Sequence, residues 1–139
     1  MKIILDSNIL FSALIKNSTT RKIIIEYEDF FLFPAYIFEE LEEHKKELMQ
    51  KSRMSSEDFE NLLQLLLKKV IIVSKEDLNH KKEEAIELMK NIDLDDALFI
   101  ACALASQNSV IWSDDKKLKQ QTKIKILNTS EIIEYFKVE

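Results

Sequence analysis

Glycine is absent from this sequence of 139 residues, and proline and cysteine each occur only once. The phosphate-binding P-loop and the dinucleotide-binding fingerprint both require glycine, so the sequence excludes both. Tight hairpin turns also favour glycine, which disfavours short antiparallel meanders. The single cysteine, Cys102, excludes a disulfide framework and a zinc site built from cysteines.

Long apolar runs and an excess of positive charge are missing as well. The longest uninterrupted apolar run, residues 97–105, is far shorter than a membrane span. An acid at Asp6 comes too early for a signal peptide, so we expect a cytoplasmic protein with no membrane contact. The net charge of −5 is opposite in sign to that of a protein that binds nucleic acid by simple attraction. An acidic protein can still act on phosphodiesters if metal cations lie between its carboxylates and the substrate.

Short apolar segments alternate with helical stretches along the whole chain. Strands separated by helices imply crossover connections and a parallel sheet. The predicted helix at 96–107 is apolar on all sides, which indicates burial on both faces. We therefore expect an α/β fold that forms a single three-layer domain over residues 1–139, with a central parallel sheet of about five short strands and helices on both faces. The predicted strands are 2–6, 30–33, 70–73, 110–112 and 124–127, and the other helices are 8–16, one capped by Thr19 or Thr20, 34–51, one capped by Ser55, 75–90 and one capped by Thr129.

Acidic residues follow the predicted strands at the edge where parallel sheets gather their ligand sites. Asp6 ends the first strand, and Asp114 and Asp115 follow the fourth. Three more acids precede the buried helix: Asp93, Asp95 and Asp96. Carboxylates that converge repel one another unless some are protonated or a cation is present, and such oxygen ligands suit Mg²⁺ or Mn²⁺. Two such ions can support phosphodiester hydrolysis, although each acid taken alone is equally well explained as a helix cap.

The helix at 34–51 carries further acids on known faces. Its apolar stripe includes Ile37 and Leu41. Glu40 and Glu42 lie at the borders of this stripe, so either can reach a site beside the core. Glu39 and Glu43 are expected to point into solvent.

Four short motifs, in a fixed order, resemble those of the PIN-domain nucleases. They are Asp6-Ser7-Asn8 after the first strand, Glu40-Leu41, Asp96-Ala97 and Ser113-Asp114-Asp115 after the fourth strand. The resemblance implies a PIN-like fold and a Mg²⁺- or Mn²⁺-dependent endoribonuclease. It implies that the catalytic, metal-binding carboxylates are Asp6, Glu40, Asp96 and Asp115.

The same resemblance implies supporting roles for several neighbours. Ser113 would form a hydrogen bond within the pocket and Asn8 would orient Asp6, with Asp93 and Asp114 as secondary acids. Either Asp114 or Asp115, and either Asp95 or Asp96, can be the inward acid; the family spacing favours the second of each pair. Lys116, Lys117 and Arg21 are candidate RNA-backbone contacts, or simply solvated side chains.

The family also implies partners. Many PIN domains are toxins of VapBC toxin–antitoxin pairs and dimers are common, so an antitoxin partner and a homodimer are expected. Two other functions stay open: a non-catalytic PIN-fold module that binds RNA or protein, and a phosphatase with Asp6 as nucleophile. The phosphatase would usually have an acid two residues after the nucleophile, where this sequence has Asn8.

Overall fold

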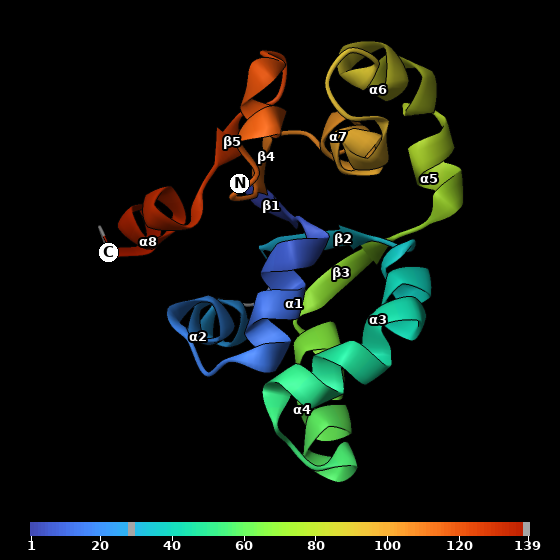
Figure 1. Cartoon of the computed structure of the whole chain (residues 1–139). Coiled ribbons are helices and arrows are strands. Elements are labelled where there is room, and N and C mark those ends of the chain that lie inside the picture. Colours follow the sequence, from blue (N-terminus) through green and yellow to red (C-terminus); the bar gives the residue numbers. More distant parts are fainter. Residues whose placement is uncertain (28–29, 138–139) are drawn as a thin grey trace.

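A five-stranded, entirely parallel sheet forms the centre of the computed structural model, which describes residues 1–27 and 30–137 (Figure 1). The strands lie in the order β3-β2-β1-β4-β5. The predicted parallel α/β sheet is therefore confirmed. Its strands are β1 (Lys2–Leu5), β2 (Phe31–Pro34), β3 (Val70–Val73), β4 (Ser109–Trp112) and β5 (Ile126–Leu127).

Helices cover both faces of the sheet, as predicted. Figure 1 shows α1 to α4 gathered on one side and α5, α6 and α7 on the other, with α8 beside β5. The helices are α1 (Ser7–Ile15), α2 (Thr19–Glu26), α3 (Ile37–Ser52), α4 (Ser56–Lys68), α5 (Lys75–Asn79), α6 (Lys82–Met89), α7 (Ala97–Ala105) and α8 (Thr129–Lys137), with 3₁₀ turns η1 (Leu94–Asp96) and η2 (Lys116–Gln120). Among the helices of the described residues, none is long and apolar enough to cross a membrane.

The core lies where β1 and α7 meet. Ile3, Ile4 and Leu5 are completely buried, because β1 is the central strand and has helices on both faces. Helix α7 packs on this sheet, with the Phe99 ring centroid 5.8 Å from that of Phe33 in β2. The uniformly apolar sequence of α7 is explained by this position between the sheet and α6.

Several predicted boundaries were wrong. Pro34 ends β2, so the helix predicted at 34–51 begins only at Ile37, and Ser18 occupies the capping position of α2 in place of Thr19 or Thr20. The stretch 75–90 forms two helices, because the chain bends at residues 80–81 and wraps around α7 (Figure 1). The helix predicted at 96–107 begins after η1 and ends at Ala105. Strand β5 starts at Ile126 because the Gln121 side chain binds both backbone groups of Ile124. Asn128, not Thr129, caps α8: its Oδ1 accepts from the Glu131 amide, and Glu131 Oε1 accepts from the Asn128 amide.

The register of the sheet places two polar residues side by side. Leu5 at the end of β1 pairs with Trp112 at the end of β4, so the residues that follow, Asp6 and Ser113, are neighbours. The chain reverses its direction across the sheet at this point, since β2 and β3 lie on one side of β1 and β4 and β5 on the other. Such a switch point is where open α/β sheets bind their ligands.

Candidate metal centre

Asp6 lies at the switch point and is held in place by its neighbours. Its backbone amide donates to the Trp112 carbonyl at 3.1 Å, and its side chain is only 5% exposed. Ser113 Oγ donates to Asp6 Oδ2 at 2.6 Å, and the Asn8 backbone amide donates to Oδ1 at 3.4 Å. Burial raises the pKa of the Asp6 carboxyl, while the Ser113 and Asn8 hydrogen bonds oppose this shift. Asn8 thus contacts Asp6 through its backbone amide, and its own side chain is exposed.

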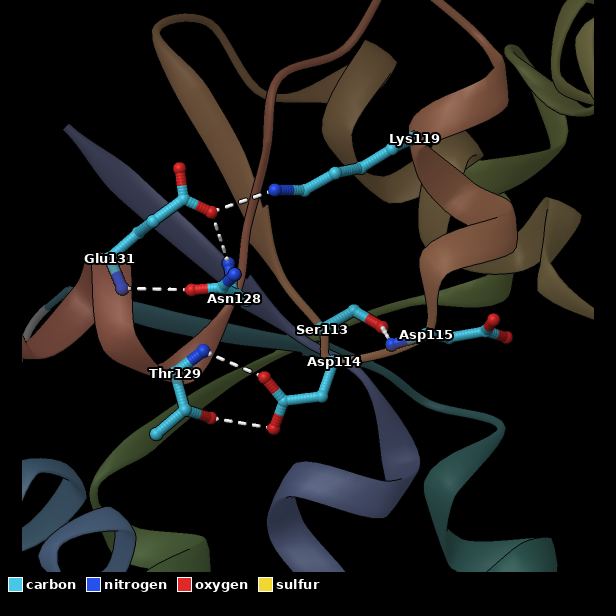
Figure 2. Close-up of polar contacts among 7 residues, drawn as sticks. All are labelled: Ser113, Asp114, Asp115, Lys119, Asn128, Thr129 and Glu131. Carbon is cyan, nitrogen blue, oxygen red and sulfur yellow. Dashed lines mark hydrogen bonds and ion pairs between the residues drawn. The ribbon is translucent and has the colours of Figure 1, made fainter.

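The two acids after β4 point to different places. The Asp115 amide donates to Ser113 Oγ at 3.0 Å, and the Asp115 carboxylate accepts from the Lys117 amide at the start of η2. Asp114 instead accepts from the Thr129 amide and the Thr129 hydroxyl, both at 2.7 Å (Figure 2). Asp114 is therefore engaged by α8, and Asp115 is the acid of this pair that approaches the other carboxylates.

Three carboxylates come together beside Asp6. Asp93, Asp96 and Asp115 each offer an oxygen atom within 4.8 Å of the other two. Asp93 also caps η1, since its Oδ1 accepts from the Asp95 amide at 3.0 Å. The sequence pattern assigned Asp93 only a secondary place, although its spacing of three residues from Asp96 puts both acids on the same turn.

Asp96 is the least satisfied member of this cluster. Its Oδ2 is buried and has no hydrogen-bond partner within residues 1–27 and 30–137. Burial, followed by the charges of Asp6, Asp93 and Asp115, raises the pKa of Asp96 to about 7. An acid in such a position needs either a proton or a cation to be stable at neutral pH.

Glu40 reaches the site from α3. It accepts a hydrogen bond from the Ser7 hydroxyl, at the first residue of α1. Burial raises the pKa of Glu40, the Ser7 hydrogen bond opposes this, and the nearby charge of Asp6 adds to the increase. Glu40, Asp6 and Asp96 line a common cleft of about 540 Å³.

The prediction that Glu43 points only into solvent was wrong. Glu43 is exposed, as expected, but it also lines the cleft, because the opening extends over the outer face of α3. Glu42 does not line it. Asp95 is exposed and lines the rim, whereas Asp96 lies deeper.

The chemistry of these groups fits a divalent cation. All the candidate ligands are hard carboxylate oxygens, which suit Mg²⁺ or Mn²⁺, and Asp96 Oδ2 is a buried acceptor without a donor. Lys117 forms an ion pair with this cluster, because its Nζ is 4.0 Å from Asp93 Oδ2.

The three residues predicted to contact RNA differ in their surroundings. Lys116 and Lys117 are exposed beside the cluster. Arg21 donates to the carbonyls of Ala13 and Leu14 at the end of α1, at 2.7 and 3.4 Å. Its guanidinium is therefore used by the fold, and we leave Arg21 out of the proposed site.

The sequence of the chain matches the family model described as "PIN domain" over residues 4–137. This chain belongs to the PIN-domain family. A solved structure with a similar fold is the VapBC2 complex from Rickettsia felis, bound to a DNA fragment from its promoter. That similarity has a TM-score of 0.67 at 17% sequence identity and covers 92% of this PIN domain and 98% of the other chain. No curated protein matches the sequence.

Proposed function

We propose that this PIN domain is a Mg²⁺- or Mn²⁺-dependent endoribonuclease that hydrolyses RNA phosphodiester bonds. The observation that carries the proposal is the convergence of Asp93, Asp96 and Asp115 on one point, with a buried Asp96 oxygen that lacks a donor. A structural cap would have its oxygens satisfied. A cluster left in this state is typical of a cation-binding site.

In this proposal, some residues bind the cation and others hold the acids in position around it. Asp93, Asp96 and Asp115 would hold the cation, with Asp6 next to them. A bound divalent cation polarises a phosphoryl oxygen and lowers the pKa of a coordinated water. Ser113 fixes the position of Asp6 through its 2.6 Å hydrogen bond.

Glu40 is suited to accept a proton in the same cleft. Ser7 holds Glu40 Oε1 and leaves Oε2 available. Because burial raises the pKa of Glu40, this carboxylate is a better base than an exposed glutamate. In this proposal, Glu40 Oε2 takes the proton from the water that attacks phosphorus.

A second part of the proposal concerns partners. The structural neighbour is part of a VapBC complex, which supports an antitoxin partner for this chain and a role as the toxin of such a pair. An exposed Leu94, 56% accessible at the edge of the cleft, offers an apolar contact for a partner. We further propose that the protein is cytoplasmic and that it forms a homodimer. Light scattering of the purified protein tests the homodimer.

The experiment that tests the activity is cleavage of single-stranded RNA in Mg²⁺ or Mn²⁺, compared with DNA of the same sequence. We expect the wild type to cut RNA, Asp6→Asn and Glu40→Gln to lose cleavage, and EDTA to stop it. Binding of RNA or of an antitoxin without any turnover in either metal would favour the non-catalytic module instead. A trapped aspartyl-phosphate at Asp6 would favour the phosphatase.

A further inference from the structure

Asp6 lies between two hollows on opposite sides of α1. The cleft on the α3 side is rich in acids. The second hollow, on the α2 side, has a volume of about 280 Å³ and shares Asp6 and Asn8 with the cleft. Its lining also includes Asp114, Asp115, Ser12 and Thr20, and no lysine or arginine lines it among the residues that the structure describes.

The wall opposite the carboxylates is made of neutral hydrogen-bond donors. Thr20 is 7% exposed, and its hydroxyl forms no hydrogen bond within residues 1–27 and 30–137. The Ser12 hydroxyl and the Asn8 side-chain amide are likewise without a partner in the described part of the chain. Because its hydroxyl is accessible from the hollow and has no protein partner among the described residues, Thr20 can donate a hydrogen bond to a ligand there.

The start of α2 adds to this wall. Thr20 lies in the first turn of α2, and Ser18 at the capping position makes no side-chain hydrogen bond to that turn. Ser18 Oγ is itself buried without a partner, and the first turn holds no acid. Free amides at the start of a helix favour an anion. One wall of the hollow therefore favours an anion. The other carries Asp6, Asp114 and Asp115, of which Asp114 already accepts two hydrogen bonds from Thr129, so an anion is favoured there only with a cation bound.

We propose that this hollow is a phosphate subsite, in which Thr20, Ser12 and Asn8 donate hydrogen bonds to the non-bridging oxygens of a nucleic-acid phosphate next to the metal centre. The proposal rests on the proposed nuclease function and names the residues that position its substrate. A volume of about 280 Å³ is far larger than the ~30 Å³ share of one water molecule, so the hollow has room for a phosphate group.

The charges of the two walls make phosphate binding dependent on the cation. Without a cation, Asp6 and Asp115 repel a phosphate, and neutral donors are too weak to overcome this repulsion. With the cation bound, the phosphate contacts the cation on one side and the Thr20 wall on the other. Phosphate and metal should therefore each strengthen the binding of the other.

The test combines two probes and two pairs of variants. The first probe is a single-stranded RNA of twelve nucleotides with randomised sequence, for which KM and kcat are measured in Mn²⁺. The second probe is dimethyl phosphate, a phosphodiester without a base, whose Mn²⁺-dependent binding is followed by broadening of its ³¹P resonance. Thr20→Val removes the hydroxyl at almost constant shape, and Thr20→Ser restores it. Ser12→Ala is the second deletion, and Thr19→Val, at an exposed position of the same turn, is its control.

We expect Thr20→Val and Ser12→Ala each to raise KM and weaken dimethyl phosphate binding by about tenfold, the effect of one lost hydrogen bond to a charged group. Mn²⁺ affinity in the absence of phosphate should stay within about twofold, and Thr20→Ser and Thr19→Val should behave like the wild type. A folded Thr20→Val variant with unchanged KM and unchanged dimethyl phosphate affinity would overturn the subsite. If the wild type cuts no RNA, the nuclease proposal fails, and dimethyl phosphate alone decides: weaker binding in Thr20→Val supports the subsite and equal binding refutes it.

Discussion

The acids Asp114 and Asp115 are adjacent in the chain, yet they lie in two regions that treat negative charge in opposite ways (Figure 2). In the corner where α8 joins the sheet, Asp114 receives two hydrogen bonds from Thr129, and Trp112 Nε1 donates to the Thr129 hydroxyl at 2.9 Å. In the same corner Glu131 is paired with Lys119 at 2.8 Å. Among the described residues, the partners of Asp114 and Glu131 are hydrogen-bond donors or a lysine.

In the cluster beside Asp6, the carboxylates of Asp93, Asp96 and Asp115 each offer an oxygen within 4.8 Å of the other two. Asp96 lies beside Asp6, Asp93 and Asp115, and its Oδ2 has no donor among the described residues. Such repulsion lowers the stability of the free protein, whereas the hydrogen bonds of Asp114 raise it. The difference between the corner and the cluster indicates that the corner acids stabilise the fold, and it fits the proposal that the cluster acids bind a cation.

The largest expected effect comes from replacing each of the two adjacent acids in turn. Asp115→Asn should lower kcat/KM for RNA cleavage by at least about a hundredfold, because it removes a cation ligand. Asp114→Asn should leave kcat/KM within about threefold, since its carboxylate binds α8 and not the cluster. Initial rates in Mn²⁺ measure both. Equal losses of kcat/KM in the two variants would show that the corner and the cluster do not differ in function.

The second largest expected effect is the dependence of the free energy of unfolding on pH, which Asp96 should dominate. Because the pKa of Asp96 is raised to about 7, the folded protein holds this proton more tightly than the unfolded chain does. The resulting stabilisation is complete below about pH 4 and is lost as the pH rises through about 7. Asp96 is only partly buried, so solvent screening reduces the effect to about 1–2 kcal/mol.

Thermal unfolding in EDTA at pH 5 and pH 8 measures this loss. Asp96→Asn, which cannot ionise, should show a smaller difference between the two pH values than the wild type. Asp95→Asn, at the exposed neighbour, is the matched control and should follow the wild type. An Asp96→Asn variant that loses as much stability at pH 8 as the wild type would contradict the assignment.

A smaller effect is expected in the corner itself. Asp114→Ala removes both hydrogen bonds to Thr129 at the start of α8 and should lower the free energy of unfolding by about 1 kcal/mol. Urea unfolding at pH 8 in EDTA provides the measurement. Asp115→Ala under the same conditions should cause a smaller loss, because relief of the repulsion from Asp96 offsets the lost hydrogen bond to the Lys117 amide. The reverse order of stabilities would be evidence against the comparison.

The smallest effect concerns Lys117 at the boundary. Its exposed Nζ is 4.0 Å from Asp93 Oδ2, where it partly neutralises the cluster. Lys117→Met should strengthen Mn²⁺ binding by less than about threefold, since exposed ion pairs contribute ~0–1 kcal/mol. Calorimetry detects a change of this size. Weaker Mn²⁺ binding in this variant would mean that the lysine supports the site.

Much of the fold was predictable because its information is local. Apolar segments and caps predicted the parallel sheet, and the PIN resemblance was confirmed by the family match over residues 4–137. The break at residues 80–81 was not predictable, since it depends on how the chain packs around α7. Strand β5 was predicted too long because nothing in the local pattern shows that the Gln121 side chain binds Ile124.

The site was predictable as a set of acids but not as an arrangement. Strand ends placed Asp6 and the pair after β4 at one edge of the sheet. The separation of Asp114 from Asp115 depends on Thr129, fourteen residues further on from Asp115, and no spacing rule reveals it. The contribution of Asp93 depends on the turn η1, of which the helix predicted at 96–107 included only Asp96. The catalytic roles of Asp6, Glu40, Asp96 and Asp115 remain predictions.

The most direct test of the central claim is calorimetric titration of Mn²⁺ into the wild type and into an Asp6→Asn/Asp96→Asn double variant, with Asp114→Asn as the control. We expect the wild type and Asp114→Asn to bind Mn²⁺ and the double variant to lose this binding. Equal weak binding in all three proteins would show that the cleft acids are no more than caps and surface charges, and would contradict the metal centre.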